Sequence, residues 1–408
     1  MTALLARTRR LDADVDLLRF AGRDGVLCER GRSGLAGRGC AARLPWAGGD
    51  PAAAARSAAR TLAGIEVDDE VRLPGCGPVA FGTLPFTPGA PSDLVVPSVV
   101  AGRADDGTRW ITTIGAAAPD PHRPDLEGDV VQLPAVRRFT VTAQRDPDDW
   151  CVLVERATKA IAGGTLHKVV LARQIDVAAD RPIDGLAVLE RLRSAYPGCH
   201  IVSVAGFVAA SPELLVSVAG DIVRSHPMAG TAPRGGDPTT DQRLAASLLA
   251  STKDRQEHQI TIDMVHDTLL PWCSYLDYEA EPSVVAVANV QHLATMVEGR
   301  LSQPAPSVLE LVAALHPTPA VAGWPRDEAV AWIAEHEGFD RRRYAGTAGW
   351  VDSAGNGTWA VSVRCAEIDG PAARAWAGNG IVADSDPSTE LAETRSKLQA
   401  LLSAIVRP

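Results

Sequence analysis

The 408-residue sequence has few cysteines, and their pattern excludes the common cysteine-based frameworks. There are seven of them, an odd number, and they are widely spaced with no CxxC pair. Disulfide-linked domains and structural zinc sites need paired or regularly spaced cysteines. We therefore expect reduced thiols in a cytoplasmic protein.

The sequence also lacks a long apolar run and a basic run. It has no stretch of about 18 apolar residues, and its N-terminal apolar stretch is too short for a signal peptide, so no membrane association is expected. No Lys/Arg-rich segment is present and the formal net charge is -10, so nucleic-acid binding is not expected either. A few well-placed Arg and Lys residues can still bind an anionic small molecule.

Secondary structure is clearer after residue 145 than before it. Residues 1–145 show no chemical motif; short apolar runs such as 93–101 predict several strands with long loops, and the polar segment 119–129 predicts a loop or linker. In residues 146–408, periodicity predicts helices at 149–161, 184–195, 241–270, 307–314, 326–337 and 387–405. It predicts strands at 166–177, 200–208, 213–218, 283–290, 293–301, 345–352, 358–367 and 372–377, with a hairpin turn at 209–212. Because strands mostly follow strands, we expect an α+β fold with an antiparallel sheet, in a single domain spanning 1–408.

Two of the predicted helices carry carboxylates at helical spacing. Asp254 and Glu257 lie three residues apart on one helix, and Glu390 and Glu393 lie three apart on the other, with Lys397 one turn further on. Residues at this spacing project from the same helix face. If the two faces meet in one cavity, the converging carboxylates require a cation, and oxygen-only ligands favour Mg²⁺. The alternative is a pair of solvated helix faces with ordinary ion pairs.

The segment before the second acidic pair is rich in glycine. Residues 377–387 read AGNGIVADSDP and lead directly into the predicted helix. Glycines allow the backbone to approach a ligand closely, and a helix N-terminus can receive an anion. This context favours a binding site over a solvated helix face.

Nine motifs between residues 167 and 397 follow the order found in one enzyme family. They are HKVVLAR (167–173), SPELL (211–215), MAGTAPRG (228–235), KDRQEH (253–258), NVQHL (289–293), HPTPAVAG (316–323), RRYAGTAGW (342–350), VSVRCAEI (361–368) and AGNGIV…ELAETRSK (377–397). The set resembles the chorismate-utilising enzymes, which include isochorismate synthases, salicylate synthases, anthranilate synthase component I and aminodeoxychorismate synthase. The resemblance covers more than half of the chain. It implies a large two-layer antiparallel β-sheet core with helices packed outside and the active site in a deep cleft.

The resemblance also implies chorismate as the substrate, Mg²⁺ as the cofactor, and roles for individual residues. Glu257 and Glu393 match the magnesium ligands, and Asp254 and Glu390 match acids that act beside them through metal-bound water. Substrate contacts are implied at eight further positions, which are Gly230, Thr231, His292, Ala320, Tyr344, Arg364, Gly378 and Lys397.

Two of these residues have a simpler alternative, whereas Arg364 does not. Without the resemblance, Tyr344 and His292 would be interpreted as core residues with satisfied polar groups. Arg364 lies between apolar residues of a predicted strand, where an unpaired guanidinium is costly. A buried arginine there needs an anion, which fits a bidentate contact with a substrate carboxylate.

Lys168 distinguishes family members that use water from those that use ammonia. The lysine in HKVVLAR matches the lysine of the water-using members, whereas the ammonia-using members carry a glutamine there. Lys168 would be the base for water attack at C2 of chorismate and must be neutral to act so. Glu213 in SPELL matches the general acid for the departing 4-hydroxyl, which needs a raised pKa. The alternative for Lys168 is an edge-strand lysine that points to water.

Together these residues imply a Mg²⁺-dependent isochorismate synthase, which is an isomerase. Salicylate synthases share Lys168 and Glu213 but also eliminate pyruvate; Ala320 and Val321 in HPTPAVAG resemble the isochorismate synthases instead. A salicylate synthase, an ammonia-using subunit and a non-catalytic chorismate-binding protein remain as alternatives. A water-using enzyme needs no glutaminase subunit, so we expect a monomer. Menaquinone and siderophore pathways are both left open.

Overall fold

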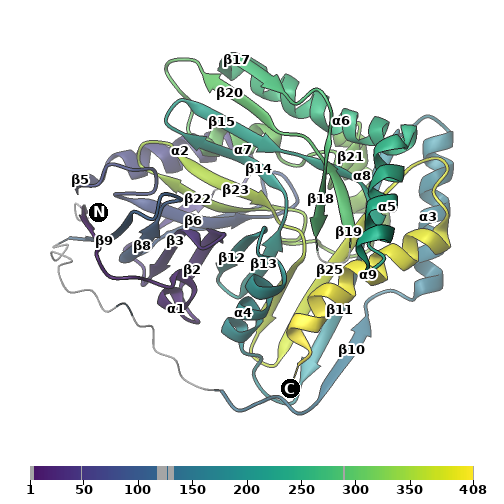
Figure 1. Cartoon of the computed structure of the whole chain (residues 1–408), viewed down its shortest axis with the longest axis horizontal. Coiled ribbons are helices and arrows are strands. Elements are labelled where there is room, and N and C mark those ends of the chain that lie inside the picture. The colour runs from purple at the N-terminus through teal and green to yellow at the C-terminus, as the bar shows by residue number, and fades with distance from the viewer. Residues whose placement is uncertain (1–3, 47, 117–125, 127–132, 288–289, 408) are drawn as a thin grey trace.

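The protein has a layered α+β architecture (Figure 1). The computed structural model describes residues 4–46, 48–116, 126, 133–287 and 290–407. Within them the strands form three sheets of 13, nine and three strands, and the β1–β5 pair is parallel while the other recorded pairs are antiparallel. This confirms the predicted fold class. The loop predicted at 119–129 lies outside the described residues, apart from Leu126.

The 13-stranded sheet is built from both halves of the chain. In spatial order its strands are β10 (Phe139–Ala143), β11 (Lys168–Ala179), β25 (Ala372–Ile381), β24 (Cys365–Asp369), β13 (Phe207–Ser211), β12 (His200–Val204), β2 (Val26–Arg30), β3 (Ser33–Arg38), β8 (Val99–Arg103), β9 (Arg109–Gly115), β1 (Leu5–Arg10) and β5 (Glu66–Asp69), with β21 (Gly323–Trp324) paired to β11. Strand β2 pairs directly with β12. The N-terminal part of the chain and the part that carries the motifs therefore share one sheet.

The other two sheets contain the remaining strands. The nine-stranded sheet has the order β17 (Cys273–Tyr278), β20 (Val297–Leu301), β15 (Ile222–His226), β14 (Leu214–Ala219), β23 (Gly357–Val361), β22 (Thr347–Asp352), β6 (Val79–Leu84), β7 (Ser92–Val96) and β4 (Ala42–Trp46). The small sheet consists of β16 (Met228–Pro233), β19 (Val290–Ala294) and β18 (Ser283–Val287).

The helices lie around these sheets, and their starting points are encoded locally. They are α1 (Leu17–Ala21), α2 (Pro51–Ala63), α3 (Pro147–Ala162), α4 (Gly185–Ala195), α5 (Pro238–Ala250), α6 (Thr252–Leu269), the 3-10 turn η1 (Leu270–Trp272), α7 (Val308–Leu315), α8 (Arg326–His336) and α9 (Pro387–Ile405). Asp146, Asp237 and Asp386 cap α3, α5 and α9, each followed by a proline at the first helical position. No helix in the described part of the chain is long and apolar enough to cross a membrane.

Alternating side chains of the 13-stranded sheet face two apolar layers. Val26 and Cys28 of β2 belong to the same buried cluster as Phe81 and Trp359 of the nine-stranded sheet. Leu27, between them, belongs to a second cluster that includes residues of α4 and α9. Side chains alternate across a strand, so one face of the sheet packs on the second sheet and the other on helices. This is the predicted two-layer core with helices outside (Figure 1).

One predicted helix and one predicted strand that carry site residues prove to be divided. The helix expected at 241–270 is two helices, α5 and α6, because Ser251 adopts an extended conformation (φ -72°, ψ 111°) and its side chain accepts a hydrogen bond from the Asp254 N–H. The strand expected at 358–367 is β23 and β24, with Arg364 between them in the left-handed region at φ 49°. The placement of Arg364 inside a strand was therefore wrong.

The predicted hairpin turn at 209–212 was also wrong. The tight turn lies at Ala205–Gly206, between β12 and β13, so the strand expected at 200–208 is in fact two strands. Residues Pro212 and Glu213 instead carry the chain from the 13-stranded sheet into the nine-stranded sheet. Likewise, the two strands expected at 283–290 and 293–301 are three: β18, β19 and β20. The sheet-to-sheet crossing places Glu213 between the two large sheets.

Candidate active site

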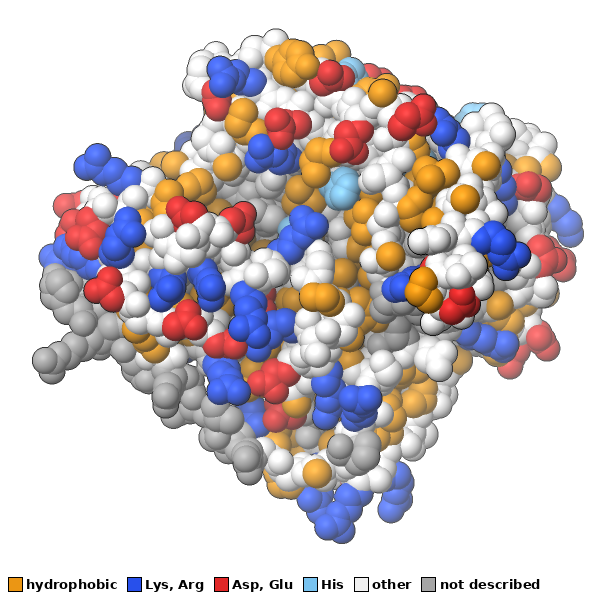
Figure 2. Space-filling view, in the orientation of Figure 1, with side chains coloured by type: hydrophobic (Ala, Val, Ile, Leu, Met, Phe, Trp, Pro, Cys, Tyr) orange, Lys and Arg blue, Asp and Glu red, His pale blue; other side chains and the backbone are white. Residues whose placement is uncertain are grey.

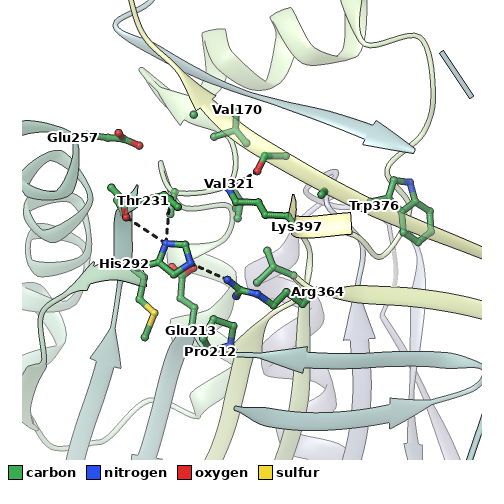
Figure 3. A pocket seen from close by; sticks show the side chains of 18 of the residues that line it. Val170, Pro212, Glu213, Thr231, Glu257, His292, Val321, Arg364, Trp376 and Lys397 are labelled. Atoms are coloured by element: carbon green, nitrogen blue, oxygen red, sulfur yellow. Dashed lines mark hydrogen bonds between the residues drawn. The ribbon is translucent and has the colours of Figure 1, made fainter. Parts of the chain in front are cut away.

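One cavity, of about 790 Å³ including its open mouth, brings together most of the predicted site residues (Figure 3). The predicted residues that line it are Lys168, Glu213, Gly230, Thr231, Glu257, His292, Ala320, Tyr344, Arg364, Gly378 and Lys397. Asp254, Glu390 and Glu393 are not among the lining residues. The lining residues come from the 13-stranded and the three-stranded sheet, from helices α6 and α9 and from the connecting loops, so segments distant in sequence meet there.

Lys168 is buried at the start of β11 and paired with an acid from α6. Its side chain is 2% exposed, and its Nζ lies 2.6 Å from Oε1 of Glu257. Strand β11 has β25 on one side and the short β21 on the other, so the alternative of an edge-strand lysine that points to water is wrong. Gly380 of β25 packs directly against this pair; sequence analysis did not single it out.

Glu213 lies where the chain crosses between the two large sheets, and it is buried. Burial raises its pKa to about 7; the Met228 N–H, Lys168 and Arg364 oppose this shift more weakly. The predicted rise in pKa is therefore confirmed. A carboxyl group with this pKa is partly protonated at neutral pH and can donate a proton.

His292 holds a fixed orientation between two cavity walls (Figure 3). Arg364 Nη2 donates to its Nε2 at 2.8 Å, so in the neutral ring the proton is on Nδ1. Nδ1 then donates to the Gly230 carbonyl at 3.3 Å and lies 3.1 Å from Thr231 Oγ1. Burial and the Arg364 charge hold the pKa of His292 well below its usual value, so the ring is neutral.

Arg364 has unused hydrogen-bonding capacity toward the cavity. In the described part of the chain no ion pair joins its guanidinium to a carboxylate, and His292 takes one of its five N–H groups. Burial lowers its pKa, yet a guanidinium stays protonated in proteins. Such a group can receive a ligand carboxylate in a bidentate manner.

Tyr344 and Gly378 form a close contact on another wall. Tyr344 is buried and its ring stacks on Trp376 with the centroids 6.0 Å apart. Burial raises the pKa of the Tyr344 phenol, so it stays neutral and can donate. A Cβ on Gly378 would lie 2.7 Å from the Tyr344 hydroxyl oxygen, so only glycine fits there.

Lys397 of α9 is held by three acceptors. Its Nζ donates to the Gly378 carbonyl at 3.0 Å and to Asn379 Oδ1 at 2.9 Å, and it lies 2.7 Å from Glu393 Oε1. The amide of Asn379 in turn donates to Glu390 Oε2 at 3.0 Å. Asn379 thus links the lysine to the second acidic pair, a role that no sequence pattern indicated.

The four predicted metal-site carboxylates do not form a ready-made cage. Burial, with Glu257 and Glu393 nearby, raises the pKa of Asp254; burial and Glu393 also raise that of Glu390. In the ranges that the structure describes, no three His, Cys, Asp or Glu side chains are arranged to hold a metal ion. Glu257 and Glu393 each face a lysine instead. Two separate carboxylates still fit Mg²⁺, which typically binds one or two carboxylates together with waters and an anionic substrate.

The chain is similar to known proteins over most of its length. The family model described as chorismate binding enzyme matches residues 28–406. The isochorismate synthase DhbC of Bacillus subtilis is 37% identical over 80% of this chain and 81% of its own length. EntC, the isochorismate synthase of Escherichia coli, is 36% identical over 80% of each chain.

A solved structure gives the same result for the fold. The menaquinone-specific isochorismate synthase MenF from Escherichia coli superposes with a TM-score of 0.82 at 25% identity, covering 99% of this chain and 95% of that one. The family match spans nearly the whole chain, and the relatives exceed 30% identity over most of it. This chain therefore belongs to the family of chorismate binding enzymes.

Proposed function

We propose that this protein is a Mg²⁺-dependent isochorismate synthase, which adds water at C2 of chorismate and expels the 4-hydroxyl group. One observation carries the proposal: a buried lysine, Lys168, and a carboxyl group of raised pKa, Glu213, face the same cavity. Water attack and loss of a hydroxyl need a base and an acid at two different ring carbons. The names of the relatives support the same reaction.

The cations of the cavity suit a substrate with two carboxylates. Arg364 and Lys397 both line it, and the neutral Tyr344 hydroxyl can donate a further hydrogen bond. The net charge of the chain is -10, so these groups act locally rather than through an overall basic surface. Figure 2 shows Lys/Arg and Asp/Glu side chains interspersed over one face of the molecule.

The proposed reaction uses Lys168 at C2 of the substrate ring and Glu213 at C4. Lys168 takes a proton from water as the water oxygen bonds to C2, and the ring double bonds shift. Glu213 gives its proton to the 4-hydroxyl oxygen, which leaves as water. Lys168 ends protonated and Glu213 ionised, so proton exchange with solvent restores the starting state. His292 joins two walls of the cavity, because it is hydrogen-bonded to the Arg364 side chain and to the Gly230 carbonyl.

Glu257 and Glu393 would hold Mg²⁺, with Asp254 and Glu390 beside them. When bound, the ion supplies positive charge that neutralises a substrate carboxylate. Lys168 and Lys397 pair with these two acids in the structure, at 2.6 and 2.7 Å. We also propose that the enzyme acts in the cytoplasm. It needs no glutaminase subunit, because its nucleophile is water.

The test is product analysis. Purified protein is incubated with chorismate and Mg²⁺, and the products are separated by chromatography with and without an added isochorismatase. We expect isochorismate in equilibrium with chorismate. Salicylate together with pyruvate would assign a salicylate synthase, and turnover that requires ammonia would contradict the role given to Lys168. Binding of chorismate without any turnover would indicate a non-catalytic protein.

A further inference from the structure

A buried ion pair lies directly behind the cavity. Glu337 follows the last residue of α8, and Arg341 lies four residues further on; their side chains are 0% and 1% exposed. Arg341 Nε lies 2.6 Å from Glu337 Oε2, and its Nη2 lies 2.7 Å from Oε1. Desolvation of two charges offsets much of their attraction, so such a pair is weak evidence for a gain in stability. Its presence calls for another role.

The same two side chains hold the backbone of two cavity walls. Arg341 Nη2 donates to the Val170 carbonyl at 2.6 Å, and Nη1 donates to the Val321 carbonyl at 2.9 Å. Glu337 Oε1 accepts from the Ala172 N–H at 2.7 Å. Val170 and Val321 both line the cavity. One rigid guanidinium therefore fixes the separation between β11 and the 316–323 segment.

These contacts fill a gap in the strand ladder. On the side of β11 away from β25, β21 pairs with Lys168 and Val169, and β10 pairs from Ile175 onwards. The Val170 N–H still reaches the Ala322 carbonyl at 2.9 Å, but no strand in the described residues covers the Val170 carbonyl and the Ala172 N–H on this side. Buried backbone groups need partners. Glu337 and Arg341 supply them two to four residues from Lys168.

Arg341 also supports the wall that carries Tyr344. Its guanidinium lies over the Phe86 ring at 4.3 Å and over the Tyr344 ring at 5.9 Å. The Tyr344 N–H donates to the Arg341 carbonyl at 2.9 Å. Three separate segments of the cavity wall thus meet at one side chain.

We propose that Glu337 and Arg341 are positioning residues for the reaction: they hold Val170 and Val321 at a fixed separation, so that the substrate ring is held against Lys168. This inference rests on the proposed function, because it concerns the same cavity. Neither residue touches the cavity itself. Their action passes through the backbone of β11 and of the 316–323 segment.

The test compares two arginine-to-lysine variants. Arg341→Lys keeps the positive charge for Glu337, but a single ammonium cannot span both carbonyls and the carboxylate. Arg343→Lys is the matched control, because Arg343 also bonds a carboxylate, that of Glu367 at 2.8 Å, and the two carbonyls of Val204 and Ala205. It lines a different pocket.

We expect Arg341→Lys to lower kcat by about 10- to 100-fold while KM changes less than about threefold, because misplacement by about 1 Å can cost that much in rate. Arg343→Lys should keep the wild-type kcat. Circular dichroism melts run beside the assay show what fraction of each variant is folded. If Arg341→Lys does not fold, Glu337→Gln, which keeps an acceptor for the Ala172 N–H, takes its place with the same expectation.

The proposal is overturned if the Arg341 variant matches the Arg343 control in kcat, or if its loss of rate equals its unfolded fraction. The proposed function is judged separately, by the wild-type product. If wild-type protein converts chorismate to something other than isochorismate, that function fails. The ratio of variant to wild-type chorismate consumption still decides the role of the ion pair.

Discussion

Gly380 offers a test of the Lys168–Glu257 pair that removes no functional group. This glycine lies on β25, opposite Val170 of β11. A Cβ built there would lie 2.7 Å from Lys168 Cε, 2.8 Å from Glu257 Oε1 and 3.3 Å from Lys168 Nζ. Gly380→Ala therefore pushes both side chains away from their positions and leaves their chemistry unchanged.

The size of the effect follows from these distances. Carbon–carbon contacts are comfortable from about 3.5 Å, so Lys168 Cε must move by about 0.8 Å from the built 2.7 Å. The nearest atoms are side-chain ends rather than backbone, so the strand can stay in place. Because a displacement of about 1 Å in reacting groups can cost about 100-fold, we expect kcat to fall by about 10- to 100-fold.

The assay measures kcat and KM for chorismate in Gly380→Ala and in a control, Gly198→Ala. A Cβ on Gly198 meets no atom within 4 Å, so the control should match the wild type. Thermal melts show that both variants are folded at the assay temperature. If Gly380→Ala keeps kcat within about twofold of the wild type, the position of Lys168 does not limit turnover and the reasoning fails.

Further expectations concern the acid, the base and the metal. Lys168→Ala and Glu213→Gln should each lower kcat by roughly 10²- to 10⁴-fold with the fold intact, and near-wild-type rates would refute their roles. The Glu213 pKa of about 7 means that its acid form is lost, and kcat falls, as pH rises through about 7; a flat rate profile there would contradict this. Because the folded protein binds the Glu213 proton more tightly than the unfolded chain does, this carboxyl group stabilises the fold at low pH. The stabilisation is lost as pH rises from about 4.5 to about 7, so the melting temperature of the wild type should drop over this range relative to Glu213→Gln. EDTA should abolish activity, and added Mg²⁺ should restore it. Glu257→Gln should weaken Mg²⁺ binding measured by calorimetry, and unchanged binding would exclude Glu257 as a ligand.

A residue's place in the site can be predicted from the sequence where that residue belongs to a long series of motifs in a fixed order. Lys168, Glu213, His292 and Arg364 come from four segments, and the structure gathers all of them at one cavity. The antiparallel α+β fold could likewise be predicted, because strands follow strands along the chain. Motif order carries long-range information that local periodicity does not.

Local patterns failed where tertiary contacts decide the outcome. The alternation of side chains cannot show that Pro212 and Glu213 pass from one sheet to the other, because apolar residues continue on both sides. Ser251 did carry a signal, since Ser251 and Asp254 form a helix-start pattern that the continuous apolar stripe obscured. The Glu337–Arg341 pair gave none, because its partners Val170 and Val321 lie about 20 to 170 residues away.

The carboxylate pairs show how far helical spacing alone can be used. Spacing correctly placed Asp254 with Glu257 and Glu390 with Glu393 on one helix each. It also accounts for the pairing of Glu393 with Lys397, four residues further along α9, but it could not show that Glu257 would meet Lys168. That pairing depends on how α6 lies against β11, which no local pattern records.

The most direct measurement uses chorismate and Mg²⁺ in water labelled with heavy oxygen, stopped early and analysed by mass spectrometry. We predict isochorismate with one labelled oxygen, in its 2-hydroxyl group, because solvent water is the nucleophile activated by Lys168. Loss of this product in Lys168→Ala would support the same step. Unlabelled isochorismate, or no isochorismate from folded protein, would contradict the account.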